Sequence, residues 1–470
     1  MRKIFTLIAV LFIYSGIHSQ AWIELGTGQN ALRANNSIWS LLADPTGNIY
    51  AAGGFTDSTT YIGGLAYVAK WNGSTWSILG TGPNALIANN AIYSIVQDIS
   101  GNVYAAGNFI DINGYQFVAK WDGTTWTELS GLNALAPIYT LASDVGGNIY
   151  AAGAITDTGA ANGYHYVAKW NGSAWSELGY DTAHHTSGIK ADSSIYVLAT
   201  DRPGNVYAAG AFTDTSGYHY VAKWNDTIWT TLGADTTALK ANGTINTIIT
   251  DTFGNVYAGG TFTDSLGYYY IAKWDGTKWT ELSNPTTNQV NVLGPINALT
   301  LDSVGNVYAG GMIPDSNGNF FFVIVWNGSQ LLVANNSGSS PLNANAPILA
   351  MTSDKYGNIY AAGNFTDDSL YQYVAEFTGN IPSGVSTVSD EHLHFYPNPT
   401  SGIVFIQADH LNGTSNIEVL DGLGRSLYTQ SAESATIQTH LDLSGYSPGV
   451  YSLLIRDSSN NLMTRRIIKQ

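Results

Sequence analysis

Four of the nine histidines lie in one part of the chain and are the clearest candidates for metal ligands. His165 and His219 occupy the same place in two copies of a Gly-Tyr-His-Tyr-Val-Ala-Lys segment. His184 and His185 lie between these copies. Imidazole is a common ligand of zinc and copper, so the four side chains together could hold such an ion.

A plainer interpretation of the same histidines is that they are ordinary repeat and loop residues. Gln116, Tyr269 and Gln372 stand at the position of His165 in other copies of the segment. The adjacent pair between the copies would then be solvated, and the sequence places no acidic partner beside any of the four. We therefore predict no cofactor.

The residue inventory argues against several kinds of enzyme. The chain has no cysteine, which excludes a disulfide, a thiolate metal site and a thiol nucleophile. It has no phosphate-binding loop, zinc-binding helix or nucleophile elbow. Only eight glutamates are present, which leaves few candidates for the carboxylate pair of a glycosidase. The net charge of −16 argues against a nucleic-acid partner.

An aspartate recurs four residues before an asparagine in seven places along the chain. Seven acids at one spacing could form a metal array, but Asp at a tight hairpin is typical of an Asx-turn, and we predict a structural role. The aspartates are Asp44, Asp98, Asp144, Asp201, Asp251, Asp302 and Asp354, and the asparagines are Asn48, Asn102, Asn148, Asn205, Asn255, Asn306 and Asn358.

Paired tryptophans and a preceding lysine recur in the same way. The tryptophan pairs could stack on sugars, but their repetition favours packing between repeats. The lysines could bind anions, but we expect them to contact turn acids or aromatic rings. The pairs are Trp71/Trp76, Trp121/Trp126, Trp170/Trp175, Trp224/Trp229 and Trp274/Trp279, and the lysines are Lys70, Lys120, Lys169, Lys223 and Lys273.

These residues belong to a repeat of about 50 residues, a period typical of propellers and solenoids. A Gly-Asn-Val/Ile-Tyr-Ala segment marks its seven copies. In the second copy we predict strands over 92–98, 103–107, 117–121 and 126–129, joined by turns rich in Asp, Asn and Gly. Four antiparallel strands in one repeat correspond to one blade of a β-propeller.

The two ends of the repeat region predict that the propeller is closed. The last copy stops at Gly379 without a fourth strand, and Trp22-Ile23-Glu24-Leu25 matches the missing one. The predicted fold is all-β: a seven-bladed β-propeller with four-stranded blades closed by the N-terminal strand, over residues 20–380. Segments such as Trp71-Asn72-Gly73 and Ala258-Gly259-Gly260 resemble Kelch-type propeller repeats.

The N-terminus has the features of a signal peptide for export. Arg2 and Lys3 precede a mostly apolar run of about 11 residues, shorter than the ~20 that span a bilayer. We predict a signal peptide over 1–19, with cleavage between Ser19 and Gln20, and no transmembrane segment in the mature chain. The alternative is an uncleaved anchor.

A polar linker over 381–392 precedes short alternating strands at 393–470, which predict a small Ig-like β-sandwich. This region closely resembles the C-terminal sorting domain, type A, of the type IX (Por) secretion system of Bacteroidota. The motif residues are Tyr396, Pro397, Asn398, Pro399, Gly402, Pro448, Gly449, Tyr451, Arg466 and Lys469. The resemblance implies the type IX secretion machinery as a partner, and a protein that is secreted or attached to the cell surface.

The longer connections of the propeller must emerge on one face, where binding usually resides. They include Thr56–Ala66, Ser130–Pro137, Tyr180–Ser194, Asn284–Pro295 and Asn335–Pro347. We predict a monomeric, non-enzymatic binding or adhesion protein whose ligand is a glycan or a protein. The alternative is an extracellular polysaccharide-degrading hydrolase or lyase, and a third possibility is a structural passenger with no soluble ligand.

Overall fold

The computed structural model describes residues 22–57, 64–156, 163–179, 188–189, 191–283, 291–314, 320–334, 341–377, 393–397, 400–408, 414–420, 426–433, 436–447, 449–457 and 462–469. Within these ranges the protein is all-β, with no α-helix and three single turns of 3-10 helix at Gly28–Asn30, Gly82–Asn84 and Asp235–Thr237. The chain forms two compact units, Met1–Val325 with Leu331–Ile381, and Trp326–Gln330 with Pro382–Gln470. None of the described helices has the length and hydrophobicity to cross a bilayer.

The first unit contains seven four-stranded antiparallel sheets, numbered here along the chain. Sheet 1 comprises β2 (Ile38–Ala43), β3 (Ile49–Gly53), β6 (Ala69–Trp71) and β7 (Trp76–Ile78). Sheet 2 comprises β8 (Ile92–Gln97), β9 (Val103–Gly107), β10 (Ala119–Trp121) and β11 (Trp126–Glu128). Sheet 3 comprises β12 (Ile138–Ser143), β13 (Ile149–Gly153), β14 (Ala168–Trp170) and β15 (Trp175–Glu177).

The later sheets repeat this order. Sheet 4 comprises β16 (Ile195–Thr200), β17 (Val206–Gly210), β18 (Ala222–Trp224) and β19 (Trp229–Thr231). Sheet 5 comprises β20 (Ile245–Thr250), β21 (Val256–Gly260), β22 (Ile271–Trp274) and β23 (Trp279–Leu282). Sheet 6 comprises β24 (Ile296–Leu301), β25 (Val307–Gly311), β26 (Ile324–Trp326) and β27 (Leu331–Val333). A two-stranded ribbon, β4 (Thr56–Asp57) with β5 (Leu65–Ala66), projects from sheet 1.

Sheet 7 takes its strands from both ends of the unit. It comprises β28 (Ile348–Ser353), β29 (Ile359–Gly363), β30 (Ala375–Phe377) and β1 (Trp22–Glu24). The register pairs Trp22 with Phe377 and Glu24 with Ala375, and the two rings of the first pair lie 5.2 Å apart. The N-terminal strand therefore supplies the fourth strand that the last repeat lacks.

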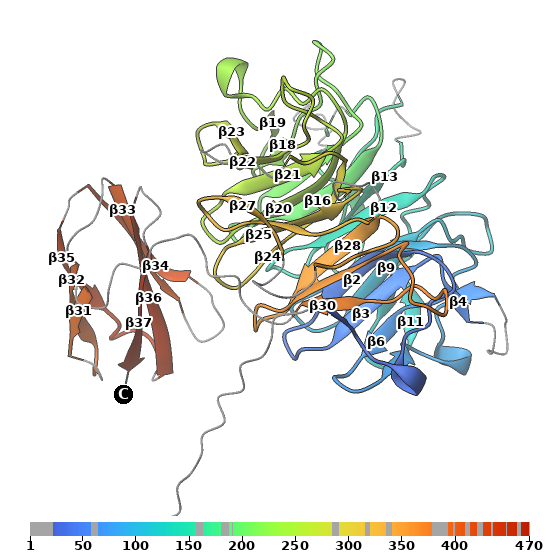
Figure 1. Cartoon of the computed structure of the whole chain (residues 1–470), viewed down its shortest axis with the longest axis horizontal. Helices are drawn as coiled ribbons and strands as arrows, with labels where there is room; N and C mark the ends of the chain where they lie inside the picture. The colour runs from blue at the N-terminus through green and yellow to red at the C-terminus, as the bar shows by residue number, and fades with distance from the viewer. Residues whose placement is uncertain are drawn as a thin grey trace, which may run out of the picture. The chain divides into compact units, whose positions relative to one another are not determined.

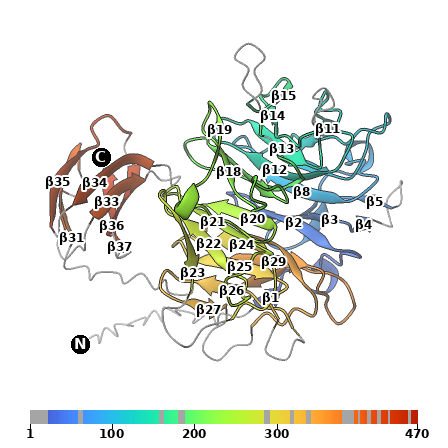
Figure 2. The ribbon, with the colours of Figure 1, turned by 90° about the horizontal axis from the view of Figure 1, so that it is seen from above.

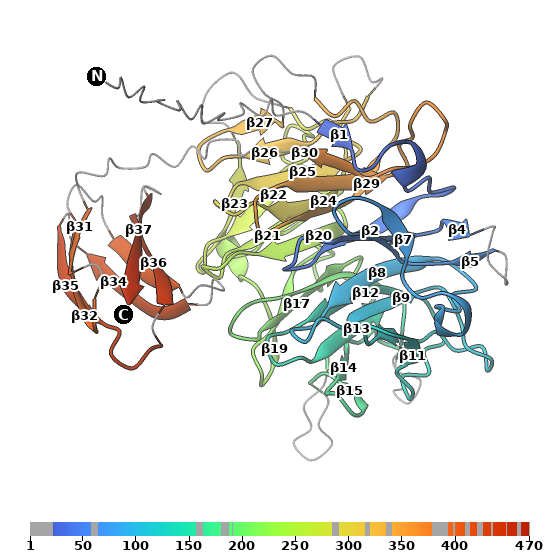
Figure 3. The same ribbon diagram turned by 90° about the horizontal axis from the view of Figure 1, so that it is seen from below.

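Each sheet packs face to face against its neighbours through its apolar side chains. The first strands of consecutive sheets contact one another from β2 to β28, and β28 also contacts β2. The second strands are buried along their whole length, which explains their near-continuous Val/Ile-Tyr-Ala-Ala-Gly sequence. Figure 2 shows first strands in the middle of the unit, and Figure 3 shows the fourth strands β7, β11, β15, β19, β23, β27 and β1 succeeding one another around its outside.

The repeated aspartate organises the turn between the first two strands. In sheet 2, Asp98 accepts hydrogen bonds from the backbone N–H groups of Ser100 and Asn102, the Asn102 side chain and the Tyr104 hydroxyl. Burial raises the pKa of this carboxyl, but its hydrogen bonds outweigh burial and lower the pKa. The tyrosine hydroxyl reaches the turn aspartate in all seven sheets.

The fourth-strand tryptophans link neighbouring sheets. The Trp126 indole N–H of sheet 2 donates to the carbonyl oxygen of Leu79 in sheet 1, at 2.7 Å. The same bond recurs at five more junctions, between Trp76 and Leu25, Trp175 and Leu129, Trp229 and Leu178, Trp279 and Leu232, and Trp22 and Ala334. In sheet 6, Leu331 stands in the tryptophan's place.

The third-strand lysines lie over aromatic rings of the same sheet. The Lys70 ammonium is 5.4 Å from the centroid of the Tyr50 ring, and equivalent pairs occur in sheets 2 to 5. These lysines therefore contribute cation–π contacts between the second and third strands of sheets 1 to 5.

The second unit, drawn in orange and red in Figure 1, contains two sheets that share one core. The first comprises β31 (Leu393–Tyr396), β32 (Ile403–Ala408) and β35 (Ile437–Asp442). The second comprises β33 (Thr414–Leu420), β34 (Ser426–Glu433), β36 (Gly449–Asp457) and β37 (Leu462–Lys469). In β32 the buried Val404 and Ile406 alternate with more exposed residues, and they share the core with Ile417 and Leu453 of the second sheet.

Candidate functional site

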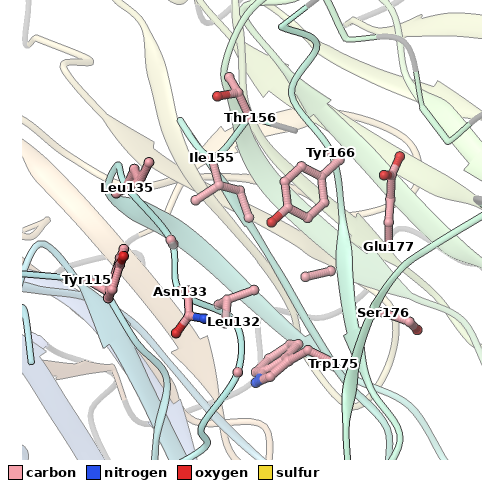
Figure 4. A pocket seen from close by; sticks show the side chains of 13 residues that line it. Tyr115, Leu132, Asn133, Leu135, Ile155, Thr156, Tyr166, Trp175, Ser176 and Glu177 are labelled. Atoms are coloured by element: carbon pink, nitrogen blue, oxygen red, sulfur yellow. The ribbon is translucent and has the colours of Figure 1, made fainter. Parts of the chain in front are cut away.

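A cavity of about 420 Å³ opens beside sheet 3. One wall is the loop Gly131–Leu135, which joins sheet 2 to sheet 3, and the other wall comes from sheet 3 itself. Figure 4 shows Tyr115 on one side, and Tyr166 and Trp175 on the other. The sequence-predicted binding loop Ser130–Pro137 therefore contributes directly to a cavity.

Sheets 3 and 6 carry an isoleucine, Ile155 and Ile313, where the other five sheets carry a phenylalanine. In five sheets a buried phenylalanine after the second strand meets an aromatic ring of the following segment edge-on, as Phe212 meets Tyr220 with centroids 4.9 Å apart. In sheet 3 the phenylalanine is replaced by Ile155, while the partner ring is retained as Tyr166. Both of these residues line the cavity.

The cavity combines flat apolar surfaces with a few polar groups. Trp175 is held in place by its hydrogen bond to the Leu129 carbonyl and by a ring contact with Trp170 at 5.5 Å. Glu177, half-buried on the same strand, is the one carboxylate among the lining residues that the structure describes. A Cβ at Gly188 would come within 2.0 Å of the Glu177 carboxylate, so glycine allows the returning loop to approach it closely. Such a lining suits a ligand that has both apolar faces and hydroxyl groups.

Two further features occupy related places in other sheets. A second cavity, of about 480 Å³, lies between the ribbon residues Asp57 and Leu65 and the loop at Gly82–Leu86. In sheets 2, 5 and 7 a fourth-strand glutamate has a raised pKa, first through burial and then through a nearby aspartate. These pairs are Glu128 with Asp111, Glu281 with Asp264, and Glu24 with Asp367. Their repetition in three sheets favours an architectural role over a catalytic one.

The structure places the candidate histidines as follows. His165 and His219 occupy equivalent bridge positions in sheets 3 and 4, and each backbone N–H donates to an alanine carbonyl of the loop that leads to the next sheet. Burial lowers the pKa of His165. His184 and His185 lie outside the described residues. In the described part of the chain, no three His, Cys, Asp or Glu side chains are grouped to hold a metal ion, and the four-histidine site stays a prediction.

The predicted sorting motif lies on strands and turns of the second unit. Tyr396 stacks on Phe405 with centroids 5.8 Å apart, and Pro397 follows it. Gly402 lies against Ser444, where a Cβ would come within 2.5 Å of the hydroxyl. Gly449 begins β36, and the buried Tyr451 donates a hydrogen bond from its hydroxyl to the Ser447 carbonyl at 2.6 Å. Arg466 and Lys469 lie on β37, where they pair with Ser452 and Gly449 of β36. The backbone of Lys469 also forms an isolated parallel β-bridge with Thr400.

Other members of the predicted sets are not described. Asn398, Pro399 and Pro448 of the motif, and the predicted cleavage site Ser19–Gln20, lie outside the described residues.

Comparison with known families identifies the C-terminal region. Residues 394–470 match the secretion system C-terminal sorting domain family. The chain thus carries a type IX sorting domain. The chain matches no curated protein sequence.

Comparison with solved structures finds alignments of low sequence identity over much of the chain. The type IX surface component PorZ of Porphyromonas gingivalis aligns at 16% identity and a TM-score of 0.48, over 95% of this chain and 60% of PorZ. The extracellular domain of the putative hybrid two-component system BT4673 of B. thetaiotaomicron aligns at 14% identity and a TM-score of 0.46, over 94% of this chain and 53% of BT4673. An ulvan lyase of polysaccharide lyase family PL25 aligns at 12% identity and a TM-score of 0.41, over 77% of this chain and 95% of the lyase. This chain thus spans little more than half of the first two, and at these scores the likenesses carry no argument about activity.

The sorting domain indicates that the protein is exported, either to the cell surface or into the medium, and that it interacts with the type IX machinery.

Sequence reasoning missed two features of this region. Ile155 could have been found, because it and Ile313 are the two isoleucines in a column otherwise made of phenylalanines in the aligned repeats. The second feature is the residue after the first isoleucine of each first strand, which is Trp39 in sheet 1 and Tyr93 in sheet 2. In the strand pairing this residue is the extra, unpaired residue of a β-bulge.

Proposed function

We propose that the protein is an exported, non-enzymatic glycan-binding protein. Its proposed layout is a signal peptide over 1–19, a seven-bladed Kelch-like β-propeller over 20–380, a linker over 381–392 and an Ig-like sorting domain over 393–470. The binding site is the cavity beside Ile155.

Two observations support the propeller. The contacts between first strands run through all seven sheets and return from β28 to β2. The β1 strand, from the start of the unit, pairs with β30 near its end. A ring of blades accounts for both, because it leaves no blade without a neighbour on either face.

The observation that carries the binding function is the composition of the cavity. Its volume lies within the roughly 300–1,000 Å³ of small-ligand sites. Trp175 and Tyr166 offer aromatic faces, while Asn133, Thr156 and Glu177 offer hydrogen-bonding groups. Glycosidases need two carboxylates about 5–9.5 Å apart, whereas the described lining has Glu177 alone, and this difference favours binding over hydrolysis.

The purified exported chain, applied to an array of extracellular polysaccharides and oligosaccharides, tests this proposal. We expect at least one glycan to bind without change, and Ile155→Phe to abolish that binding by occupying the cavity. Phe212→Ile is the matched control, because it changes the equivalent residue of sheet 4 and leaves the cavity beside sheet 3 as it is. We expect this variant to bind the glycan as the wild type does. Release of shorter products from the bound glycan would favour the polysaccharide-degrading alternative, and an array with no bound glycan would refute the proposal.

A further inference from the structure

Every first strand of the seven sheets begins with the same irregularity. In sheet 1, Ile38 pairs with Gly53 and Ser40 pairs with Ala52, so Trp39 between them is the extra residue of a β-bulge. The bulge recurs at Tyr93, Tyr139, Tyr196, Asn246, Asn297 and Leu349. Bulges change the direction of a side chain and are common next to binding sites.

The bulge lies on the same face of the unit as the longer loops. The first strand starts at Ile38 and the second strand ends at Gly53, so both the connection from the preceding sheet and the loop after the second strand meet at this edge. The first strands contact one another in the middle of the unit, where Figure 2 shows several of them, so the bulges lie around the middle of that face.

Four consecutive bulges form a row of aromatic rings. The ring centroids lie 5.0 Å apart for Trp39 and Tyr93, 5.8 Å for Tyr93 and Tyr139, and 5.9 Å for Tyr139 and Tyr196. We call these four side chains the aromatic row. None of them is buried, and Tyr196 keeps 38% of its surface exposed. The row therefore presents a partly open aromatic surface across sheets 1 to 4.

The fold does not require aromatic residues at these bulges. Sheets 5, 6 and 7 form the same bulge with Asn246, Asn297 and Leu349. The adjoining residue Ile38, which does serve the core, is fully buried, and its place is an isoleucine in all seven sheets. The rings of the aromatic row are thus additional to the packing of the sheets.

The polar groups at these positions are suited to hydroxylated ligands. No hydroxyl of Tyr93, Tyr139 or Tyr196 has a hydrogen-bond partner among the residues that the structure describes. Burial, together with the two neighbouring phenols, raises the pKa of Tyr139, so its hydroxyl remains a donor at neutral pH. Beyond the row, the Asn246 and Asn297 amides donate to the carbonyls of Ile296 and Ile348. All seven bulge positions are uncharged.

We propose that the aromatic row is a binding site for an extended neutral glycan, whose pyranose rings stack on Trp39, Tyr93, Tyr139 and Tyr196. The apolar face of a sugar ring packs on an aromatic face, and the phenol hydroxyls bind its hydroxyl groups. The absence of charge at the seven bulge positions favours neutral over anionic sugars, since it offers no ion pair to offset desolvation of a carboxylate or sulfate. This inference rests on the proposed glycan-binding function but concerns a site distinct from the cavity beside Ile155.

Isothermal titration of the exported chain with neutral hexasaccharides (cellohexaose, laminarihexaose and mannohexaose) and with hexagalacturonate tests the site. Trp39→Asn and Tyr139→Asn are suitable variants, because sheets 5 and 6 carry asparagine at the same bulge. We expect each variant to weaken binding of a neutral hexasaccharide about tenfold. We expect Tyr139→Phe, which keeps the ring and loses the hydroxyl, to weaken it less. Tyr356→Ala, at an exposed turn between first and second strands, is the matched control and should bind as the wild type does.

The outcomes separate this inference from the proposed function. Neutral-sugar binding that falls in both asparagine variants, with unchanged circular dichroism, supports the aromatic row. If Ile155→Phe abolishes binding while Trp39→Asn and Tyr139→Asn leave it intact, the cavity is the binding site and the inference is wrong. Binding of hexagalacturonate alone, or of none of the four sugars, also overturns it.

Discussion

Replacing Ile155 with phenylalanine should stabilise the first unit while closing its cavity. In five sheets a phenylalanine at this place packs against an aromatic ring, with ring centroids 4.8–4.9 Å apart and ring planes at 76–81° to each other. Such an edge-to-face pair contributes about 0.5–1.5 kcal/mol beyond the area it buries. Adding bulk to a filled core costs about 1–3 kcal/mol, but here the adjoining cavity of about 420 Å³ provides room. We therefore expect a net gain of about 0.5–1.5 kcal/mol.

Differential scanning calorimetry provides the measurement. For a unit of this size, the expected gain raises the midpoint of its unfolding transition by about 1–2 °C. The reverse exchange, Phe212→Ile in sheet 4, removes an existing ring pair and leaves a void, and should cost about 1–3 kcal/mol. A lower midpoint for Ile155→Phe than for the wild type would refute the argument, since it would mean that the space beside Tyr166 does not accept the ring that five other sheets contain.

Three further predictions concern the repeated interactions. Trp76→Phe and Trp126→Phe should each destabilise the first unit by about 1–3 kcal/mol in calorimetry, because each leaves a carbonyl of the neighbouring sheet unpaired; a much smaller loss for Trp76→Phe would argue against a joint between sheets 7 and 1. Asp98→Asn should cost about 2–3 kcal/mol in urea unfolding at neutral pH, since an amide nitrogen cannot accept from Asn102 and Tyr104; the loss should shrink as the pH falls below about 3.8, where the unfolded wild-type chain begins to bind a proton at this carboxyl, and should vanish once the pH is below the lowered pKa of the folded state. The pKa values of Tyr67 and Tyr270 are raised to about 12 by burial and then by nearby carboxylates, and those of the turn tyrosines are raised as well. Neutral phenols are thus favoured in the folded state, so stability is fully present below pH 10 and declines above it; absorbance of tyrosinate should rise together with loss of circular dichroism, and early ionisation without unfolding would contradict this.

The repeat makes the sheets predictable. The Asp-to-Asn spacing and the Gly-Asn-Val/Ile-Tyr segment locate each turn and second strand, and the Trp22-Ile23-Glu24-Leu25 match identifies β1 as a fourth strand. Strand limits differ by a few residues at most: the sequence predicts that the third strand of sheet 2 begins at Phe117, and the strand begins at Ala119.

The candidate site is harder to predict, because it depends on departures from the repeat and not on the repeat itself. A search for histidines or acids finds side chains that bind metals or protons, whereas Ile155 stands out only when it is compared with the phenylalanine that five other sheets carry. The aromatic row depends on a one-residue bulge, and hydrophobic periodicity gives no sign of which face an extra residue will take.

The pairing of β1 with β30 joins residues about 350 positions apart, from Trp22 to Phe377. During synthesis and passage through the envelope, the first strand therefore has no partner until the last repeat is present. Its three residues are also the part of the unit most exposed to mechanical load: tension applied at the N-terminus acts across a short ladder of hydrogen bonds and would peel this strand away before any other. Tethering the protein by its C-terminal region avoids that load, since the pull then enters through a strand with neighbours on both sides.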